Sequence, residues 1–133
     1  MPKPTVLFLC THNAGRSQMA LAFFNRLADN RAVAYSGGSE PADQINPAAV
    51  QVMAEVGIDI TAEKPKRWTD AMVQAADVVI SMGCGDTCPV LPGRRYEEWT
   101  LPDPAGKAVD EVRPIRDEIE KRVRTLLRDL NPQ

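Results

Sequence analysis

Residues 10–17, with the sequence CTHNAGRS, join a short apolar run to a helical pattern near the start of the chain. The run before them, Thr5–Leu9, is continuous and rich in β-forming residues, which is typical of a strand buried on both faces of a parallel sheet. After them, apolar residues recur at helical spacing between Met19 and Leu27, and Ser17 is placed to cap that helix. The segment is therefore predicted to be a strand-to-helix loop, the unit from which α/β folds are built.

This loop combines a nucleophile with the groups that hold an oxyanion. Its backbone amides can turn inward as an anion nest, and the following helix adds its partial positive end. Cys10 begins the loop, and a thiol near a helix N-terminus and an arginine loses its proton more readily. Arg16 can clasp two oxygens of a tetrahedral oxyanion at once, which a lysine does less well. We predict that Cys10 is a nucleophile beside an oxyanion cradle formed by Thr11, His12, Asn13, Ala14, Gly15, Arg16 and Ser17.

Four side chains of the loop have further expected roles. The hydroxyls of Ser17 and Thr11 are placed to donate to the thiolate, and Asn13 to pin the loop through side-chain to backbone hydrogen bonds. His12 is the single histidine of the chain and is expected to shape the turn, because it has no partner nearby in the sequence. The alternative interpretation of the segment is a buried structural cysteine followed by an ordinary capping loop.

Length, charge and cysteine content narrow the classes of function. A chain of 133 residues is expected to form a single domain, residues 1–133. A net charge of −2 without a basic stripe, together with few aromatic residues, argues against nucleic-acid binding. No apolar stretch approaches membrane-spanning length and residues 1–4 lead directly into the first strand, so we expect no membrane association, no signal peptide and a cytoplasmic location. Three cysteines, an odd number, argue against a framework of structural disulfides.

Strand and helix patterns alternate along the chain. This alternation predicts a parallel sheet with right-handed crossovers and helices on both faces. Loops that follow the first, third and fourth strands should then meet at the carboxyl edge of the sheet, where such folds bind ligands. The predicted strands are Thr5–Leu9, Ala32–Ser36, Asp77–Ser81 and Arg95–Trp99, and the helices after the first are one capped by Asn46 and ending at Gly57, one over Thr69–Ala75 and one over Val109–Leu130.

Two of these loops carry reactive side chains. Cys84 and Cys88 lie in a segment of small and turn-forming residues, and their spacing suits a redox-active disulfide, half of a zinc site or a pair of inert thiols, of which we favour the first. Asp103 lies between two prolines, which stiffen its backbone. It is either a general acid for a leaving oxygen or a simple turn former, and its place at the expected sheet edge favours the acid.

Over nearly its whole length the chain resembles the arsenate reductases built on the low-molecular-weight protein tyrosine phosphatase fold. The resemblance implies an α/β three-layer sandwich with a four-stranded parallel sheet in the order 2-1-3-4. It rests on residues 10–17, Ser36-Gly37-Gly38, Asn46-Pro47, Cys84 and Cys88 with Pro89, and Trp99 followed by Asp103-Pro104-Ala105-Gly106-Lys107.

The resemblance also implies a reaction. Cys10 attacks the arsenic of arsenate held by the loop amides and Arg16, while Asp103 protonates the oxygen that leaves as water. Cys84 then attacks the adduct and releases arsenite, and Cys88 takes over by disulfide exchange to give a Cys84–Cys88 disulfide that a thioredoxin-like protein reduces. No cofactor is implied, since the thiol reductant comes from a partner, and phosphate or sulfate would bind as an analogue of arsenate.

The chain departs from the family pattern at two positions. Relatives often carry a second cysteine directly before the loop arginine, where this chain has Gly15. Some relatives bind potassium through the loop asparagine, the serine after the second strand and an acid on the first helix. Asn13 and Ser36 match, but Leu21 stands where the acid is expected. We therefore predict no potassium site and no other metal site.

Three other functions compete with this one. A phosphotyrosine phosphatase of the same fold typically carries tyrosines after the Asp-Pro pair, where this chain has Ala105-Gly106 and no aromatic wall. A reductase coupled to mycothiol or glutathione would make Cys88 unnecessary. A sensor that binds oxyanions without turnover is disfavoured because no DNA-reading helix or basic patch is present.

Overall fold

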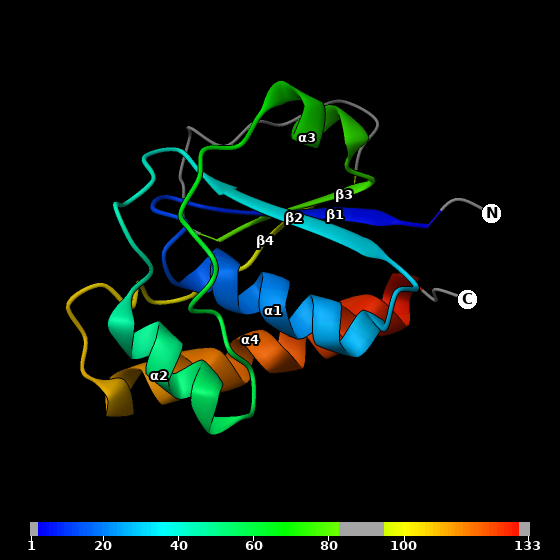
Figure 1. The fold of residues 1–133 in the computed structure, drawn as a ribbon. Coiled ribbons are helices and arrows are strands. Elements are labelled where there is room, and N and C mark those ends of the chain that lie inside the picture. The colour runs from blue at the N-terminus through cyan, green and yellow to red at the C-terminus, as the bar shows by residue number, and fades with distance from the viewer. Residues whose placement is uncertain (1–2, 83–94, 131–133) are drawn as a thin grey trace.

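The computed structural model describes residues 3–82 and 95–130, which form a four-stranded parallel sheet between two layers of helices (Figure 1). The strands are β1 (Thr5–Cys10), β2 (Val33–Gly38), β3 (Val78–Ser81) and β4 (Arg95–Glu98). They are arranged in the order β2-β1-β3-β4, and every neighbouring pair is parallel. The predicted fold class and strand order are confirmed.

The helices cover the two faces of the sheet unequally. In Figure 1, α1, α2 and α4 lie on one face and the short α3 lies on the other. The larger layer packs against β1 through Phe8, whose ring lies 5.7 Å from that of Phe24 and 5.9 Å from that of Trp99. The alternate side chains Leu7 and Leu9 face the smaller cluster under α3. The helices are α1 (Arg16–Ala28), α2 (Pro47–Glu55), α3 (Asp70–Ala75) and α4 (Val109–Leu130).

Local signals set most of the element boundaries. The side chain of Asn46 accepts a hydrogen bond from the backbone N–H of Ala48 at 2.8 Å, so it caps α2 as predicted. Gly57 adopts a φ of 81° just beyond that helix, a conformation that favours glycine. The third strand begins at Val78, one residue later than expected, although the backbone N–H of Asp77 already donates to the carbonyl of Thr5 at 2.8 Å. No helix among residues 3–82 and 95–130 is long and apolar enough to span a membrane.

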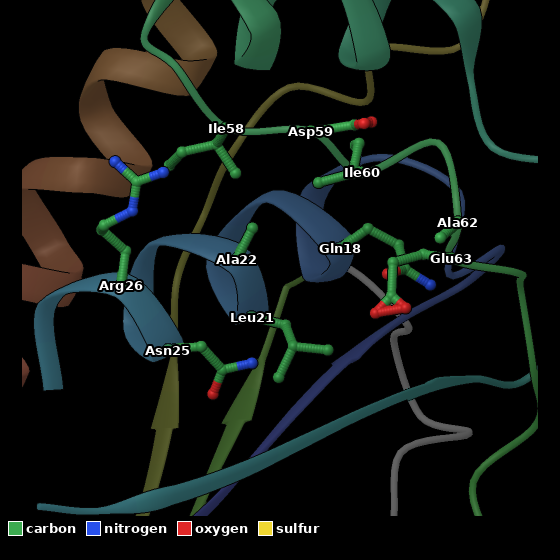
Figure 2. Close-up of a pocket in the computed structure, with 10 residues that line it drawn as sticks. All are labelled: Gln18, Leu21, Ala22, Asn25, Arg26, Ile58, Asp59, Ile60, Ala62 and Glu63. Carbon is green, nitrogen blue, oxygen red and sulfur yellow. The ribbon is translucent and has the colours of Figure 1, made fainter. Parts of the chain in front are cut away.

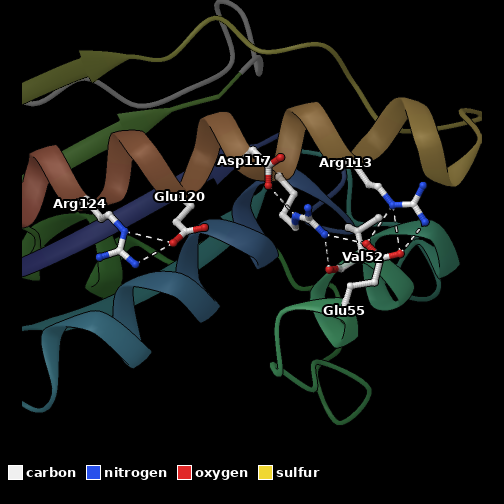
Figure 3. A network of polar contacts seen from close by, with 7 residues as sticks. Val52, Glu55, Arg113, Asp117, Glu120 and Arg124 are labelled. Atoms are coloured by element: carbon white, nitrogen blue, oxygen red, sulfur yellow. Dashed lines mark hydrogen bonds and ion pairs between the residues drawn. The ribbon is translucent and has the colours of Figure 1, made fainter.

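A charged network joins α2 to α4 (Figure 3). The carboxylate of Glu55 accepts hydrogen bonds from Arg113 at 2.7 Å and from Arg116 at 2.8 Å. Arg116 is largely buried and also donates to the carbonyl of Val52 at 2.9 Å. The hydrogen bond from Arg113, helped by that from Arg116, lowers the pKa of Glu55 from 4.5 to about 2, against the opposing effect of desolvation. Through Glu55, the network therefore connects the largely buried Arg116 to Arg113, which lies on the exposed surface of α4.

Replacement of Glu55 by glutamine is expected to lower the free energy of unfolding at neutral pH. Because the pKa of Glu55 is lower in the folded protein, its carboxylate stabilises the fold above about 4.5, and this contribution is lost as the pH falls toward about 2. Denaturant unfolding between pH 7 and pH 2 should therefore show the gap between wild type and Glu55→Gln closing. The matched control is Glu120→Gln, which removes an exposed pair with Arg124 within α4 (Figure 3). A gap that is independent of pH would contradict the prediction.

Candidate active site

The predicted nucleophile lies at the carboxyl end of β1, directly before the loop that enters α1. Cys10 is the last residue of β1 and is 2% exposed, and Arg16 is the first residue of α1. A cavity of about 30 Å³ opens over this loop. The loops that follow β1 and β4 thus meet at one edge of the sheet, as expected for a parallel α/β fold. The cavity is lined by Cys10, His12, Ala14, Gly15, Arg16, Asn46, Asp103, Pro104 and Ala105.

Two hydrogen-bonding groups converge on the sulfur of Cys10. The backbone N–H of Asn13 donates to Sγ at 3.2 Å, and the hydroxyl of Ser17 lies 2.8 Å from it. The prediction that Ser17 caps α1 is wrong: Gly15 occupies the cap position without a side-chain cap, and Ser17 lies inside the first turn. Because the helix begins two residues earlier, the hydroxyl faces the sulfur, in agreement with its other expected role.

Asn13 holds the loop in its turned conformation. Its φ of 50° lies in the left-handed region, which asparagine tolerates better than most residues. Its Oδ1 accepts a hydrogen bond from the backbone N–H of Lys66 at 3.0 Å, and its Nδ2 donates to the Ser17 hydroxyl at 2.7 Å. The expected pinning of the loop by the Asn13 side chain is confirmed, and the backbone partner lies far along the chain.

Arg16 and Asp103 form the opposite wall of the cavity. Arg16 is 6% exposed, and Nη1 of its guanidinium donates to the carbonyl of Leu101 at 3.3 Å. Its Nη2 lies 3.6 Å from Oδ2 of Asp103. The other carboxylate oxygen, Oδ1, accepts a hydrogen bond from the N–H of Ala105 at 3.0 Å. One oxygen of Asp103 is therefore held by its own turn, which leaves the other facing the arginine and the cavity.

Gly15 permits a close contact between the two loops. A Cβ atom at this position would lie 2.5 Å from Cγ of Pro104, which is too close for any side chain unless the proline moves. Pro104 directly follows Asp103, so the absence of a side chain at Gly15 allows Asp103 to approach Arg16. The sequence pattern does not predict this contact, because Gly15 and Pro104 are distant in the chain.

The loop after β2 supports the rest of the cradle. The carbonyls of Thr11 and His12 accept hydrogen bonds from the N–H groups of Glu40 at 2.8 Å and Ala42 at 3.0 Å. The Nδ1 of His12 lies 3.1 Å from the carbonyl of Glu40, as expected for a residue that shapes the turn. The carbonyl of Ala14 accepts a hydrogen bond from Asn46 at 2.9 Å. Sequence patterns did not predict this support, since it consists largely of backbone contacts.

The predicted redox pair, Cys84 and Cys88, lies outside the described residues. Within residues 3–82 and 95–130, Cys10 is the single free cysteine. No group of three or more His, Cys, Asp or Glu side chains in that part of the chain is arranged to hold a metal ion. The described part of the site thus consists of one thiol, one guanidinium, one carboxylate and a hydrogen-bonded loop.

The sequence of this chain is similar to a known protein family and to several arsenate reductases. Residues 5–133 match the family described as low molecular weight phosphotyrosine protein phosphatase. Arsenate reductase 2 of Staphylococcus haemolyticus is 39% identical over 124 residues, which cover 90% of this chain and 93% of the relative. The arsenate reductase of Staphylococcus xylosus is 37% identical over 123 residues, which cover 90% and 93%.

Solved structures of arsenate reductases also superpose on this chain. The thioredoxin-dependent arsenate reductase of Corynebacterium glutamicum superposes with a TM-score of 0.83 at 40% identity, covering 98% of this chain. This chain spans 63% of the length of that protein. An arsenate reductase described in its phosphate-binding state superposes with a TM-score of 0.84 at 30% identity, covering 96% of this chain and 98% of the relative.

Proposed function

The chain belongs to the low molecular weight phosphotyrosine protein phosphatase family, and from this premise we propose that it is an arsenate reductase that depends on a thioredoxin-like protein. The observation that carries the proposal is the pairing of Cys10 with Arg16 and Asp103 around one small cavity. The similarity to reductases described as thioredoxin-dependent and as binding phosphate supports the choice of substrate and partner.

The first step uses the described residues. Arsenate binds against Arg16 and the loop amides, where Arg16 balances its negative charge. The thiolate of Cys10 attacks arsenic and forms a sulfur–arsenic bond, and one arsenic–oxygen bond breaks. Asp103 gives its proton to the departing oxygen, which leaves as water. The Ser17 hydroxyl, 2.8 Å from Sγ, and the N–H of Asn13 stabilise the thiolate before the attack.

The second step reduces arsenic and oxidises two cysteines. The thiolate of Cys84 attacks the sulfur of Cys10, the sulfur–arsenic bond breaks, and its electron pair remains on arsenic, which leaves as arsenite. Cys88 then attacks Cys84, which frees the Cys10 thiolate and leaves a Cys84–Cys88 disulfide. A thioredoxin-like protein supplies the two electrons that reduce this disulfide. Phosphate in the same cavity is a competing ligand, because it has the charge and shape of arsenate.

A single turnover without reductant tests this reaction. Reduced protein mixed with arsenate should release arsenite and contain a Cys84–Cys88 disulfide on mass mapping. The variant Cys88→Ser should stop one exchange earlier, with Cys10 joined to Cys84. Addition of thioredoxin, thioredoxin reductase and NADPH should restore multiple turnovers to the wild type alone.

Other outcomes point to the competing functions. Cys88 left unlinked after turnover, together with activity restored by mycothiol or glutathione, would contradict the thioredoxin-coupled relay. Hydrolysis of phosphotyrosine peptides that is undiminished in the Cys84→Ser/Cys88→Ser variant would contradict a reductase altogether. Oxyanion binding without arsenite release would indicate a sensor.

A further inference from the structure

Gln18 is a buried polar residue in the first turn of α1 that lies behind the catalytic loop. It is 1% exposed, and its Nε2 lies close to three oxygens. These are the backbone carbonyl of Asn13 at 3.2 Å, Oδ1 of the same residue at 3.0 Å, and the carbonyl of Lys64 at 3.3 Å. None of the three oxygens can donate a proton, so the group facing them must be the NH₂ end of the amide. The orientation of the Gln18 amide is thereby fixed.

The other end of the Gln18 amide has no hydrogen-bond partner among the residues that the structure describes. Its Oε1 is buried and accepts no hydrogen bond from the described residues. The side chain lines a cavity of about 440 Å³ between α1 and residues 58–63 (Figure 2). An unpaired buried carbonyl destabilises a folded protein, whereas an apolar side chain of similar size would not. Stability alone therefore does not explain why this position carries an amide. The hydrogen bonds that its N–H groups donate do explain it.

We propose that Gln18 is a positioning residue for the Cys10 thiolate and that it acts through Asn13. The inference rests on the proposed function, in which Cys10 is the nucleophile. Asn13 supplies the backbone N–H that donates to Sγ, and its Nδ2 donates to the Ser17 hydroxyl. The Nε2 of Gln18 donates to both the backbone carbonyl and the side-chain oxygen of Asn13, and it also donates to the carbonyl of Lys64. Gln18 thereby links Asn13 to a distant part of the chain.

The hydrogen-bond directions explain why the hydrogen bonds from Gln18 to Asn13 affect the thiolate. A thiolate has no proton, so its 2.8 Å contact with Ser17 requires the hydroxyl to donate. The amide of Asn13 donates to the same hydroxyl oxygen at 2.7 Å and so leaves the hydroxyl proton free for the sulfur. The second donor, the N–H of Asn13, is aimed at Sγ by the left-handed backbone at this residue. Both donors to the sulfur therefore depend on the conformation that Gln18 holds.

Alkylation of Cys10 tests this role without any arsenate chemistry. The rate of reaction with iodoacetamide, assigned to Cys10 by mass mapping, is measured against pH for wild type and two variants. Gln18→Met keeps the volume and removes the donors, and its midpoint should rise by about one pH unit, a roughly tenfold loss of thiolate. Gln18→Glu places a carboxylate against three oxygens and should raise the midpoint further. The titratable and charged groups that line the Cys10 cavity, His12, Arg16 and Asp103, are unchanged in both variants.

Two further measurements separate positioning from structure. Gln18→Lys restores a donor and should return the midpoint toward that of wild type, and the exposed control Gln51→Met should leave it unchanged. A lower unfolding temperature with an unchanged alkylation midpoint in Gln18→Met would show a purely structural role and overturn the inference. So would a midpoint in Gln18→Lys as high as that in Gln18→Met, when both are folded. Failure of the proposed function appears separately, as wild-type protein that releases no arsenite.

Discussion

Replacement of Arg16 by lysine is expected to lower kcat/KM for arsenate by about 100- to 1,000-fold, the loss typical of removing one preorganised oxyanion donor. Arg16 is 6% exposed, and Nη1 of its guanidinium donates to the carbonyl of Leu101 while Nη2 lies 3.6 Å from Oδ2 of Asp103. A lysine has one ammonium group in place of this fork, so it cannot hold the carbonyl and clasp two oxyanion oxygens together. The charge is kept, and the geometry is lost.

The experiment compares Arg16→Lys with Arg128→Lys, which makes the same change at an exposed position of α4. Steady-state reduction with thioredoxin gives kcat/KM, and protection of Cys10 from iodoacetamide by phosphate reports oxyanion binding directly. We expect both to fall in Arg16→Lys and neither to change in the control. Wild-type protection by phosphate in Arg16→Lys would show that the loop amides alone hold the anion, and would remove Arg16 from the proposed cradle.

The sequence patterns predicted the parts of the site that follow from local chemistry. The apolar residues before Cys10 and the helical spacing after Met19 predict a loop between a strand and a helix. This prediction needs no information about the rest of the chain. Parallel strands then bring the loop containing Asp103 to the same sheet edge, and the structure places both residues at one cavity. Asn46 was predictable as a cap because its signal lies within four residues.

The remaining features depend on contacts between distant parts of the chain. The sequence pattern predicts a start of α1 that is two residues too late, because Ser17 resembles a cap while its sulfur partner lies seven residues earlier. The contact of Gly15 with Pro104 spans two loops and leaves no local pattern. The sequence does not single out Gln18, because its face of α1 also carries the polar residues Asn25 and Arg26. Only its hydrogen bonds to Asn13 and Lys64 identify its role.

Replacement of Asp103 by asparagine is the second change with a large expected effect. The amide has nearly the same shape but cannot transfer a proton to a departing oxygen, so formation of the sulfur–arsenic bond should slow by about 100- to 10,000-fold. The side chain is 47% exposed, and its Oδ1 is held by the N–H of Ala105. The asparagine can keep that hydrogen bond, so the turn should remain in place. Phosphate should still bind, because Arg16 and the loop amides that hold the anion are unchanged.

The rate must be measured in a single turnover, since reduction by thioredoxin would otherwise hide a slower first step. Mixing reduced Asp103→Asn with arsenate and quenching at intervals gives the rate at which arsenite and the protein disulfide appear. Asp43→Asn makes the same change of charge at an exposed position and should match wild type. Equal single-turnover rates in wild type and Asp103→Asn would mean that water protonates the leaving oxygen. Asp103 would then serve only to orient Arg16, from which its carboxylate lies 3.6 Å away.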